Sequence, residues 1–203
     1  MNDPSVETPR GAADEAALLE RSRRGDLDAF NTIVELHQRL VYNLCLRMLG
    51  GPPSAEDATQ ETFISAFRNI ESFTGANFRA WLMRIAGNVC VDELRKRSRR
   101  PAVSLDAPAP ATGATPDVAD HAGGPELVAI RGEQRRSIEA ALLRLPADQR
   151  LAVVMCDVQG FSYEEIALAT RASLGTVKSR IARGREKLRR ELRPTDEGTI
   201  GGT

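Results

Sequence analysis

Residues 162–192 read SYEEIALATRASLGTVKSRIARGREKLRREL, and this stretch decides the fold of the C-terminal part of the chain. Ser162 and Glu165 have the S-x-x-E spacing of a capping box, in which two side chains satisfy free backbone amides at the start of a helix. A turn at Arg171 follows, and Ser173 is a natural N-cap for a second helix. The stretch therefore predicts a helix-turn-helix.

The second helix of this motif separates apolar side chains from cationic ones. Its apolar residues recur at a helical period and are expected to pack on the first helix: Val177, Ile181, Leu188 and Leu192. Polar and basic residues lie opposite or beside them: Ser173, Thr176, Lys178, Ser179, Arg180, Arg183 and Lys187. A recognition helix has this layout, because its polar side reaches bases and phosphates in the major groove. The alternative is a basic helix that only closes a bundle.

The charge distribution supports contact with a polyanion, although the net charge of the 203 residues is zero. Residues 79–100 and 171–193 are strongly basic, whereas residues 101–130 contain four acids and no Lys or Arg. Two basic regions joined by an acidic segment suggest two nucleic-acid surfaces and a connection that avoids the polymer. Solvated basic helix faces are the alternative on charge alone.

Other features exclude several classes of protein. No apolar run approaches the roughly 20 residues of a membrane span, and the N-terminus lacks a signal-peptide core, so we expect a cytoplasmic protein. Cys45, Cys90 and Cys156 are isolated in apolar contexts, which predicts buried thiols in a reducing compartment. We find no metal cluster, cofactor motif or catalytic constellation, and therefore expect no enzyme and no small-molecule substrate.

The N-terminal half has the pattern of a helical bundle. A helical period begins near Ala16 and is expected to stop at residues 50–53, which read GGPP. Ser54 is then expected to cap a helix with Asp57 in its first turn. A loop at 71–77 precedes a last helix with the apolar stripe Phe78, Leu82, Ile85 and Val89.

These patterns predict an all-α protein with two small helical domains. The helical domains cover residues 15–100 and 128–193, and the second contains helices from about Pro125 to Pro146 and from Ala147 to Val158. Residues 101–127, rich in Pro, Ala, Gly and Thr, predict a flexible acidic linker. Residues 1–14 and 194–203 are expected to be disordered tails.

The chain resembles the group-four bacterial sigma factors, the extracytoplasmic-function (ECF) type of the sigma-70 superfamily. In the first half, SAEDATQETFISAFRNI resembles the polymerase-binding helix of region 2, and FRAWLMRIAGNVCVDELRKR resembles its minus-10 helix. In the second half, LPADQRLAVVMCDVQGFSYEEIALATRASLGTVKSR resembles region 4, which reads the minus-35 element. Small departures occur at Ala58, Phe67 and residues 170–172, where the family typically has Leu, Trp and Leu-Gly-Ile.

The resemblance implies a set of binding residues. Polymerase would bind Asp57, Gln60 and Glu61, whose alternative interpretation is a solvated helix face. Minus-10 DNA would bind Phe73, Asn77, Trp81, Arg84, Asn88, Arg95, Lys96 and Arg97, although Trp81 alone is more typical of a core residue. Minus-35 DNA would bind Ser173, Thr176, Lys178, Ser179, Arg180, Arg183 and Lys187.

The implied function is that of an alternative sigma factor. Its partners would be the clamp helices and flap of core RNA polymerase, promoter DNA, and an anti-sigma factor of the kind that is often membrane-anchored. The alternatives are a stand-alone helix-turn-helix regulator and a nucleic-acid enzyme. The first would bind its DNA site without polymerase, and the second would need a catalytic constellation.

Overall fold

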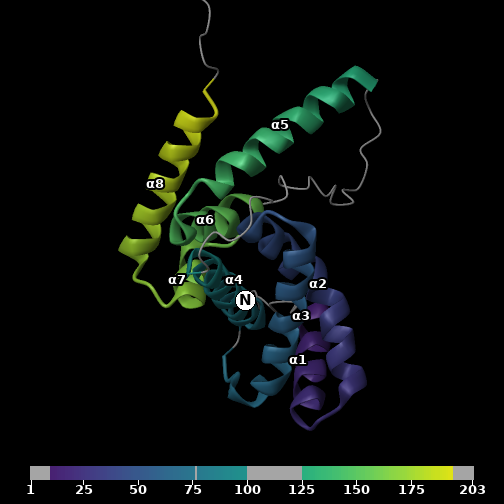
Figure 1. Ribbon diagram of the computed structural model, residues 1–203. Coiled ribbons are helices and arrows are strands. Elements are labelled where there is room, and N and C mark those ends of the chain that lie inside the picture. The colour runs from purple at the N-terminus through teal and green to yellow at the C-terminus, as the bar shows by residue number, and fades with distance from the viewer. Residues whose placement is uncertain (1–9, 76, 100–124, 194–203) are drawn as a thin grey trace, which may run out of the picture.

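The computed structural model describes residues 10–75, 77–99 and 125–193, which contain helices and no strand, and it confirms the predicted all-α class (Figure 1). The elements are α1 Arg10–Arg23, α2 Leu27–Leu49, α3 Pro52–Arg68, η1 Ile70–Ser72, α4 Phe78–Arg99, α5 Pro125–Leu143, α6 Ala147–Val153, η2 Val154–Val158, α7 Tyr163–Thr170 and α8 Leu174–Glu191. The C-terminal tail and nearly all of the predicted linker lie outside the described residues. Helix α1 begins inside the predicted N-terminal tail.

Two helix boundaries differ from the sequence prediction. The chain breaks before α2, where the Asp26 carboxylate accepts a hydrogen bond from the Ala29 amide at 3.0 Å and caps the helix. At the other end, Gly50 ends α2 in the left-handed conformation, as predicted. Helix α3 begins at Pro52, so the prediction that Ser54 is its N-cap was wrong, because proline without an amide hydrogen suits the first helical position.

Helices α1–α4 form one bundle around α2. Ile33, Val41, Leu44 and Met48 of α2 are fully buried against Leu82 and Met83 of α4. Cys45 and Cys90 are buried as predicted, and a hydrogen bond between the two thiols together with burial raises the pKa of Cys90. Cys156 is only half-buried, because it lies in η2 near the exposed Arg185.

Helices α5–α8 form a second module, from which α5 and α8 extend away from the first bundle (Figure 1). Helix α6 continues into the π-helical turn η2, and together they occupy the predicted single helix over 147–158. Gly160, with φ of 71°, ends this segment before the helix-turn-helix α7–α8. None of the described helices has the length and apolar character that a membrane crossing needs.

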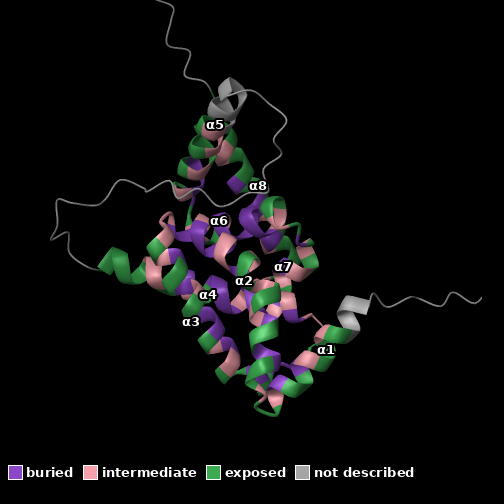
Figure 2. Cartoon of the chain, turned by 90° about the vertical axis from the view of Figure 1, so that its right-hand side faces the viewer, coloured by how far each residue is buried: buried purple, intermediate pink, exposed green. Residues whose placement is uncertain are grey.

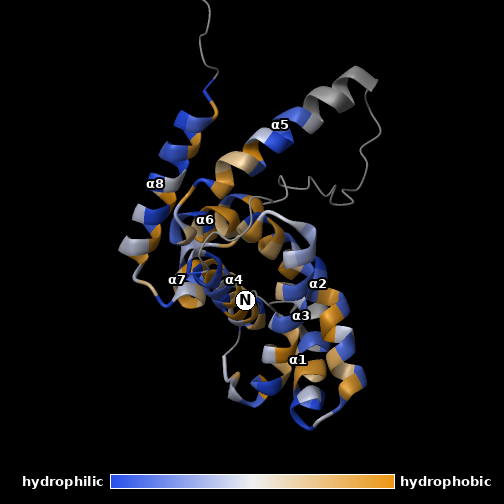
Figure 3. Cartoon of the chain, in the orientation of Figure 1, coloured by the Kyte–Doolittle hydropathy of each residue, from blue (hydrophilic) through white to orange (hydrophobic). Residues whose placement is uncertain are grey.

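The two modules share one apolar core, which the sequence did not predict. Buried side chains from α2, α4, α6, α7 and α8 form one continuous cluster (Figure 2), and apolar faces meet where the modules touch (Figure 3). Gly87 of α4 allows close approach, since a Cβ there would lie 3.0 Å from Leu151 Cδ2. The packing places α7 directly beside α4.

Candidate nucleic-acid interface

The predicted helix-turn-helix is present and capped as its sequence indicates. The Ser162 hydroxyl accepts from the Glu165 amide at 3.2 Å, and the Ser162 amide donates to the Glu165 carboxylate at 2.8 Å. Ser173 caps α8 by accepting from the Thr176 amide at 3.2 Å. Between the helices, Arg171 has φ of 50°, the left-handed conformation that glycine adopts more easily.

Helix α8 buries a shorter apolar stripe than predicted. Val177 and Ile181 are buried and Leu188 is half-buried, but Leu192 is 37% exposed because it lies past the end of the helix, beyond the reach of α6. The stripe instead includes Gly184, which is buried where α8 crosses α6. The helix is therefore anchored by its first three turns.

The predicted minus-35 residues fall into two groups. Ser173, Lys178 and Arg183 are exposed, and no described residue pairs with the Lys178 or Arg183 side chain. The remaining four are half-buried and hold intramolecular contacts: Thr176 with Ser173, Ser179 with the Thr176 carbonyl, Arg180 with Asp148 at 3.0 Å, and Lys187 with the Arg144 carbonyl at 2.9 Å. Lys178 and Arg183 are thus the cations available to an anion without loss of an internal contact.

An aromatic cluster supports the loop before α4. The rings of Phe73, Phe78 and Trp81 lie with centroids 5.4 Å apart in each pair. Phe73 is only 5% exposed, whereas Trp81 is half-buried at the edge of the cluster. The structure therefore gives the Phe73 ring a packing role with little free surface, and its assignment to minus-10 DNA stays a prediction. Trp81 presents part of its ring.

Asn77 has a local role that the sequence prediction missed. Its side-chain oxygen accepts from the Ala80 amide at 2.8 Å, as an N-cap does, and its amide group donates to Glu165 of α7 at 2.9 Å. An Asn directly before a helix is a recognised capping signal, so the cap was predictable. The hydrogen bond to α7 joins residues 88 positions apart and was not predictable from local sequence.

The remaining predicted minus-10 residues lie along α4. Asn88 is exposed, and Arg84 is half-buried; burial and then the nearby Arg171 charge lower the pKa of Arg84. Arg95, Lys96 and Arg97 are exposed at the C-terminal end of the helix. Two of these cations pair with carboxylates of the same helix, at 3.4 Å for Arg95 with Asp92 and 3.1 Å for Arg97 with Glu93.

The predicted polymerase-binding residues are all exposed on α3, but they face two different hollows. Asp57 and Glu61 line a cleft of about 400 Å³ between α3 and α4, together with Ser54, Ala58, Val89, Asp92, Glu93 and Lys96. Gln60 lines a groove of about 1010 Å³ between α2 and α3. Gln60 follows Asp57 by three positions on the same helix and lines the groove rather than the cleft.

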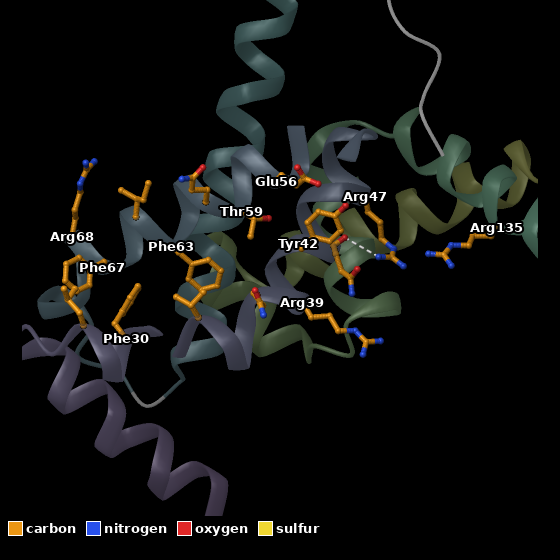
Figure 4. A pocket seen from close by; sticks show the side chains of 16 residues that line it. Phe30, Arg39, Tyr42, Arg47, Glu56, Thr59, Phe63, Phe67, Arg68 and Arg135 are labelled. Carbon is orange, nitrogen blue, oxygen red and sulfur yellow. Dashed lines mark hydrogen bonds between the residues drawn. The ribbon is translucent and has the colours of Figure 1, made fainter. Parts of the chain in front are cut away.

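The groove beside Gln60 combines an apolar floor with charged ends. Figure 4 shows the rings of Phe30, Phe63 and Phe67 near one end, and Arg39, Arg47 and Arg135 toward the other. Arg135 belongs to α5, so both modules contribute to this hollow. Among the described residues, no group of three or more His, Cys, Asp or Glu is arranged to hold a metal ion.

Comparisons with known proteins agree for both halves. Residues 33–100 match the family Sigma-70 region 2, and residues 135–188 match Sigma-70, region 4. The ECF RNA polymerase sigma factor SigW of Bacillus subtilis (strain 168) is 40% identical over 179 residues, which cover 86% of this chain and 95% of SigW. This chain belongs to the ECF sigma factors. The RNA polymerase sigma-H factor of Pseudomonas aeruginosa is 36% identical over 87% of this chain and 93% of its own.

Two solved structures have a similar fold. The sigma factor RpoE, in complex with the anti-sigma factor NepR from Bartonella quintana, matches with a TM-score of 0.63 and 29% identity, covering 80% of this chain and 96% of RpoE. CnrH, in complex with the cytosolic domain of CnrY, matches with a TM-score of 0.60 and 25% identity, covering 88% and 97%. The α1–α4 bundle therefore contains region 2, and α5–α8 contain region 4.

Sequence reasoning missed the residues that join regions 2 and 4. Arg79 donates to the Gln159 carbonyl at 2.7 Å, and its guanidinium lies 4.1 Å from the centre of the Phe161 ring. Arg150 is 6% exposed and donates to the carbonyls of Met48, Leu143 and Leu145. Only the mid-helix Arg in an otherwise apolar run, RLAVVM, hinted at a buried guanidinium.

Proposed function

We propose that this sigma factor binds core RNA polymerase in the cytoplasm, directs it to two-part promoters and helps to melt their minus-10 region. Both sigma-70 regions in a single chain are the observation that carries the proposal. One region supplies contacts to the melted strand and the other a helix-turn-helix for upstream duplex DNA. The chain itself performs no catalysis in this proposal, takes no cofactor and uses no small-molecule substrate.

We assign minus-35 recognition to the N-terminal half of α8. Ser173 and Thr176 lie at the helix start, where a recognition helix points into the major groove. Lys178 and Arg183 are exposed without internal partners among the described residues, so binding phosphate or guanine costs them no ion pair. Arg180 exchanges Asp148 for DNA, and Lys187 serves a phosphate at the edge of the contact. Ser179 supports the same surface.

We assign minus-10 recognition to the loop before α4 and to the exposed side of that helix. Trp81 offers its free edge for stacking on an unpaired base, and Asn88 offers an exposed amide. Arg84 and the exposed cations Arg95, Lys96 and Arg97 hold phosphates of the same strand. Asn77 belongs to this surface through its place in the loop, and Phe73 holds the loop in position.

We assign polymerase binding to both sides of α3. The carboxylates of Asp57 and Glu61 suit basic residues of the clamp helices. Gln60 extends the proposed contact to the neighbouring groove between α2 and α3. Region 4 is proposed to bind the flap. An anti-sigma factor is proposed as a further partner, since the similar sigma factor RpoE was solved in complex with the anti-sigma factor NepR.

Binding to core polymerase tests the proposal directly. Labelled wild-type protein is titrated with purified bacterial core polymerase, and the same titration is made with Asp57→Arg/Glu61→Arg. We expect the variant to bind about 10- to 100-fold more weakly, because two interfacial charges are reversed. Glu35→Arg/Glu164→Arg reverses two exposed charges elsewhere and should bind as the wild type does. Equal affinity of both variants, or no binding by the wild type, would contradict the assignment.

A further inference from the structure

The C-terminal end of α1 contacts the loop that we assign to the minus-10 strand. The Arg23 guanidinium donates a hydrogen bond to the Phe73 carbonyl, and its central carbon lies 5.7 Å from the centre of the Phe73 ring. Arg23 is the last residue of α1, and Phe73 directly follows η1, 50 positions along the chain. One cation therefore binds both the main chain and the side chain of Phe73.

Phe73 is the point at which the buried part of this loop becomes exposed. Its amide donates to the Ile70 carbonyl at 3.2 Å, and its ring is buried against Phe78. Thr74 and Gly75, which follow it, are exposed. The Phe73 carbonyl belongs to the planar peptide group that leads into Thr74. A hydrogen bond to this oxygen therefore fixes the direction in which the exposed residues leave the core.

The end of α1 holds the Arg23 side chain in place. The guanidinium nitrogen that does not bind Phe73 donates to the Glu20 carboxylate at 3.3 Å. Ser22 is 1% exposed, and its hydroxyl donates to a carbonyl of the preceding turn at 2.8 Å. Gly25, with φ of 86°, turns the chain away directly after the helix. Arg23 thus reaches the loop from a helix end that packing and hydrogen bonds fix.

A second contact links α1 to the other side of the loop through His37 of α2. The Glu15 carboxylate of α1 lies 2.6 Å from His37 Nε2, and the His37 ring lies 5.5 Å from the Phe78 ring. Phe73 and Phe78 flank the exposed part of the loop and pack on each other. Helix α1 therefore supports the loop from both sides, directly through Arg23 and indirectly through His37.

We propose that Arg23 is a positioning residue for minus-10 recognition, which fixes Phe73 and thereby the course of the exposed Thr74 and Gly75. Leu19, buried in the apolar core, attaches α1 to the bundle and leaves the Arg23 guanidinium to the loop. This inference rests on the proposed function for the role of the loop. It gives region 2 a residue that acts on promoter choice without touching DNA.

The test compares promoters that differ by single bases in the minus-10 element. The parent promoter is one that core polymerase with the full-length wild-type chain uses when transcript starts are mapped on fragmented genomic DNA. Run-off transcription from the parent, divided by that from each substituted template, measures discrimination. We expect Arg23→Ala to lower the largest of these ratios by about three- to twentyfold, because the peptide group after Phe73 loses its charged donor and the loop is no longer held in one orientation.

Two further variants separate positioning from a general loss of charge on α1. Arg24→Ala is the matched control, because Arg24 also pairs with Glu20, at 2.9 Å, and forms no hydrogen bond with the described residues of the loop. It should discriminate as the wild type does. Arg23→Lys keeps a cation that can donate to the Phe73 carbonyl, so we expect it to recover most of the lost discrimination. Unchanged ratios in Arg23→Ala, an equal loss in Arg24→Ala, or no recovery in Arg23→Lys would each overturn the positioning role.

Binding to core polymerase and the helical circular dichroism signal are measured on the same preparations. Transcription by Arg23→Ala that falls on all templates alike, in step with core binding or helicity, indicates a damaged fold and also overturns the positioning role. Either failure, with normal transcription by the wild type, leaves the proposed function intact. Absence of promoter-specific starts with the wild type contradicts the proposed function itself, before any variant is compared.

Discussion

At the scale of single residues, Arg150 is a buried cation that links the two modules through a hydrogen bond to the Met48 carbonyl. It is 6% exposed and binds three carbonyl oxygens near the ends of α2 and α5, including that of Leu145 at 3.0 Å. Burial lowers the pKa of Arg150, and no carboxylate of the described residues forms an ion pair with it. The positive charge is therefore compensated by the negative ends of helix dipoles rather than by an ion pair.

Replacing this side chain should be costly. We expect Arg150→Met to lower the free energy of unfolding by about 2–4 kcal/mol, because three carbonyls of helix ends and their turn lose a charged donor. Urea denaturation followed by circular dichroism measures the change. Arg144→Ala removes a mostly exposed guanidinium whose ion pair with Glu191 is 2.7 Å long, and should cost less than about 1 kcal/mol. Equal losses in the two variants would refute this role for Arg150.

Replacing Arg171 should instead raise the free energy of unfolding. Its left-handed backbone strains a residue with a Cβ, so Arg171→Gly should raise the free energy of unfolding by about 1 kcal/mol. Arg171→Ala is the matched control: it removes the charge near Arg84 but keeps the Cβ. If alanine stabilises as much as glycine, charge repulsion and not backbone strain is the cause.

At the scale of elements, α8 is held against α6 by a glycine. A Cβ at Gly184 would lie 2.6 Å from Val153 Cγ2, and the branched valine has little rotamer freedom with which to move aside. We expect Gly184→Ala to destabilise the protein by about 1–3 kcal/mol despite the better helix propensity of alanine. The midpoint of urea denaturation, compared between variant and wild type at an unchanged m-value, measures this difference.

Gly175, in the first turn of the same helix, is the matched control. A Cβ there would have only Ser173 Oγ within 4 Å, at 3.8 Å. Gly175→Ala should therefore stabilise the protein by about 0.5–1 kcal/mol. A gain in stability at Gly184 as well would mean that the two helices do not cross as closely as the structure places them.

The observed elements also show that the sequence predicts local capping signals but not contacts between distant segments. The capping box of Ser162 and Glu165 was predictable because its partners are three positions apart, and so was the end of α2 at Gly50. The contact of Arg150 with Met48 joins residues 102 positions apart, and no periodicity carries that information. That Gln60 lines a different hollow from Asp57 and Glu61 was not predictable either, because a helical wheel orders residues around α3 but does not say which neighbour covers each side.

The candidate site also combines features that the sequence predicted with features that it did not. Resemblance assigned the residues proposed to contact DNA to the loop before α4, to α4 and to α8, where Lys178, Arg183 and Asn88 are exposed. Phe73 lies in the loop that the resemblance assigns to minus-10 DNA, and the packing of its ring against Phe78 was not predicted. The packing of α5–α8 against α1–α4 was unpredictable, since it depends on surfaces that only the folded domains create.

At the scale of the whole molecule, the packing of region 4 against region 2 should depend on pH. Hydrogen bonds from Ser162 and Asn77 hold the pKa of Glu165 below its ordinary value, and Arg79 is the facing cation. A lowered pKa means that the ionised carboxylate favours the folded contact, so this contribution is complete above the ordinary Glu pKa of about 4.3 and is lost as the pH falls below it.

Energy transfer between a donor and an acceptor dye, attached through unnatural amino acids at the exposed Leu36 and Leu192, measures this pH effect. We expect constant transfer from pH 7 to about pH 5 and a decrease at lower pH, before the loss of helicity that circular dichroism reports. Glu165→Gln should shift little over the same range, because its amide does not titrate. A wild-type profile that coincides with global unfolding would assign the effect to other carboxylates, such as Asp157, whose pKa the Arg185 hydrogen bond lowers.

Mapping of transcription starts tests the sigma-factor account most directly. Purified protein is added to bacterial core polymerase on fragmented genomic DNA, and the 5′ ends of the transcripts are sequenced. We expect discrete new starts behind a shared two-part motif, lost with Asp57→Arg/Glu61→Arg and with Arg180→Ala/Arg183→Ala. No new starts with core polymerase, together with specific binding of the isolated protein to duplex DNA, would contradict the account and identify a stand-alone regulator.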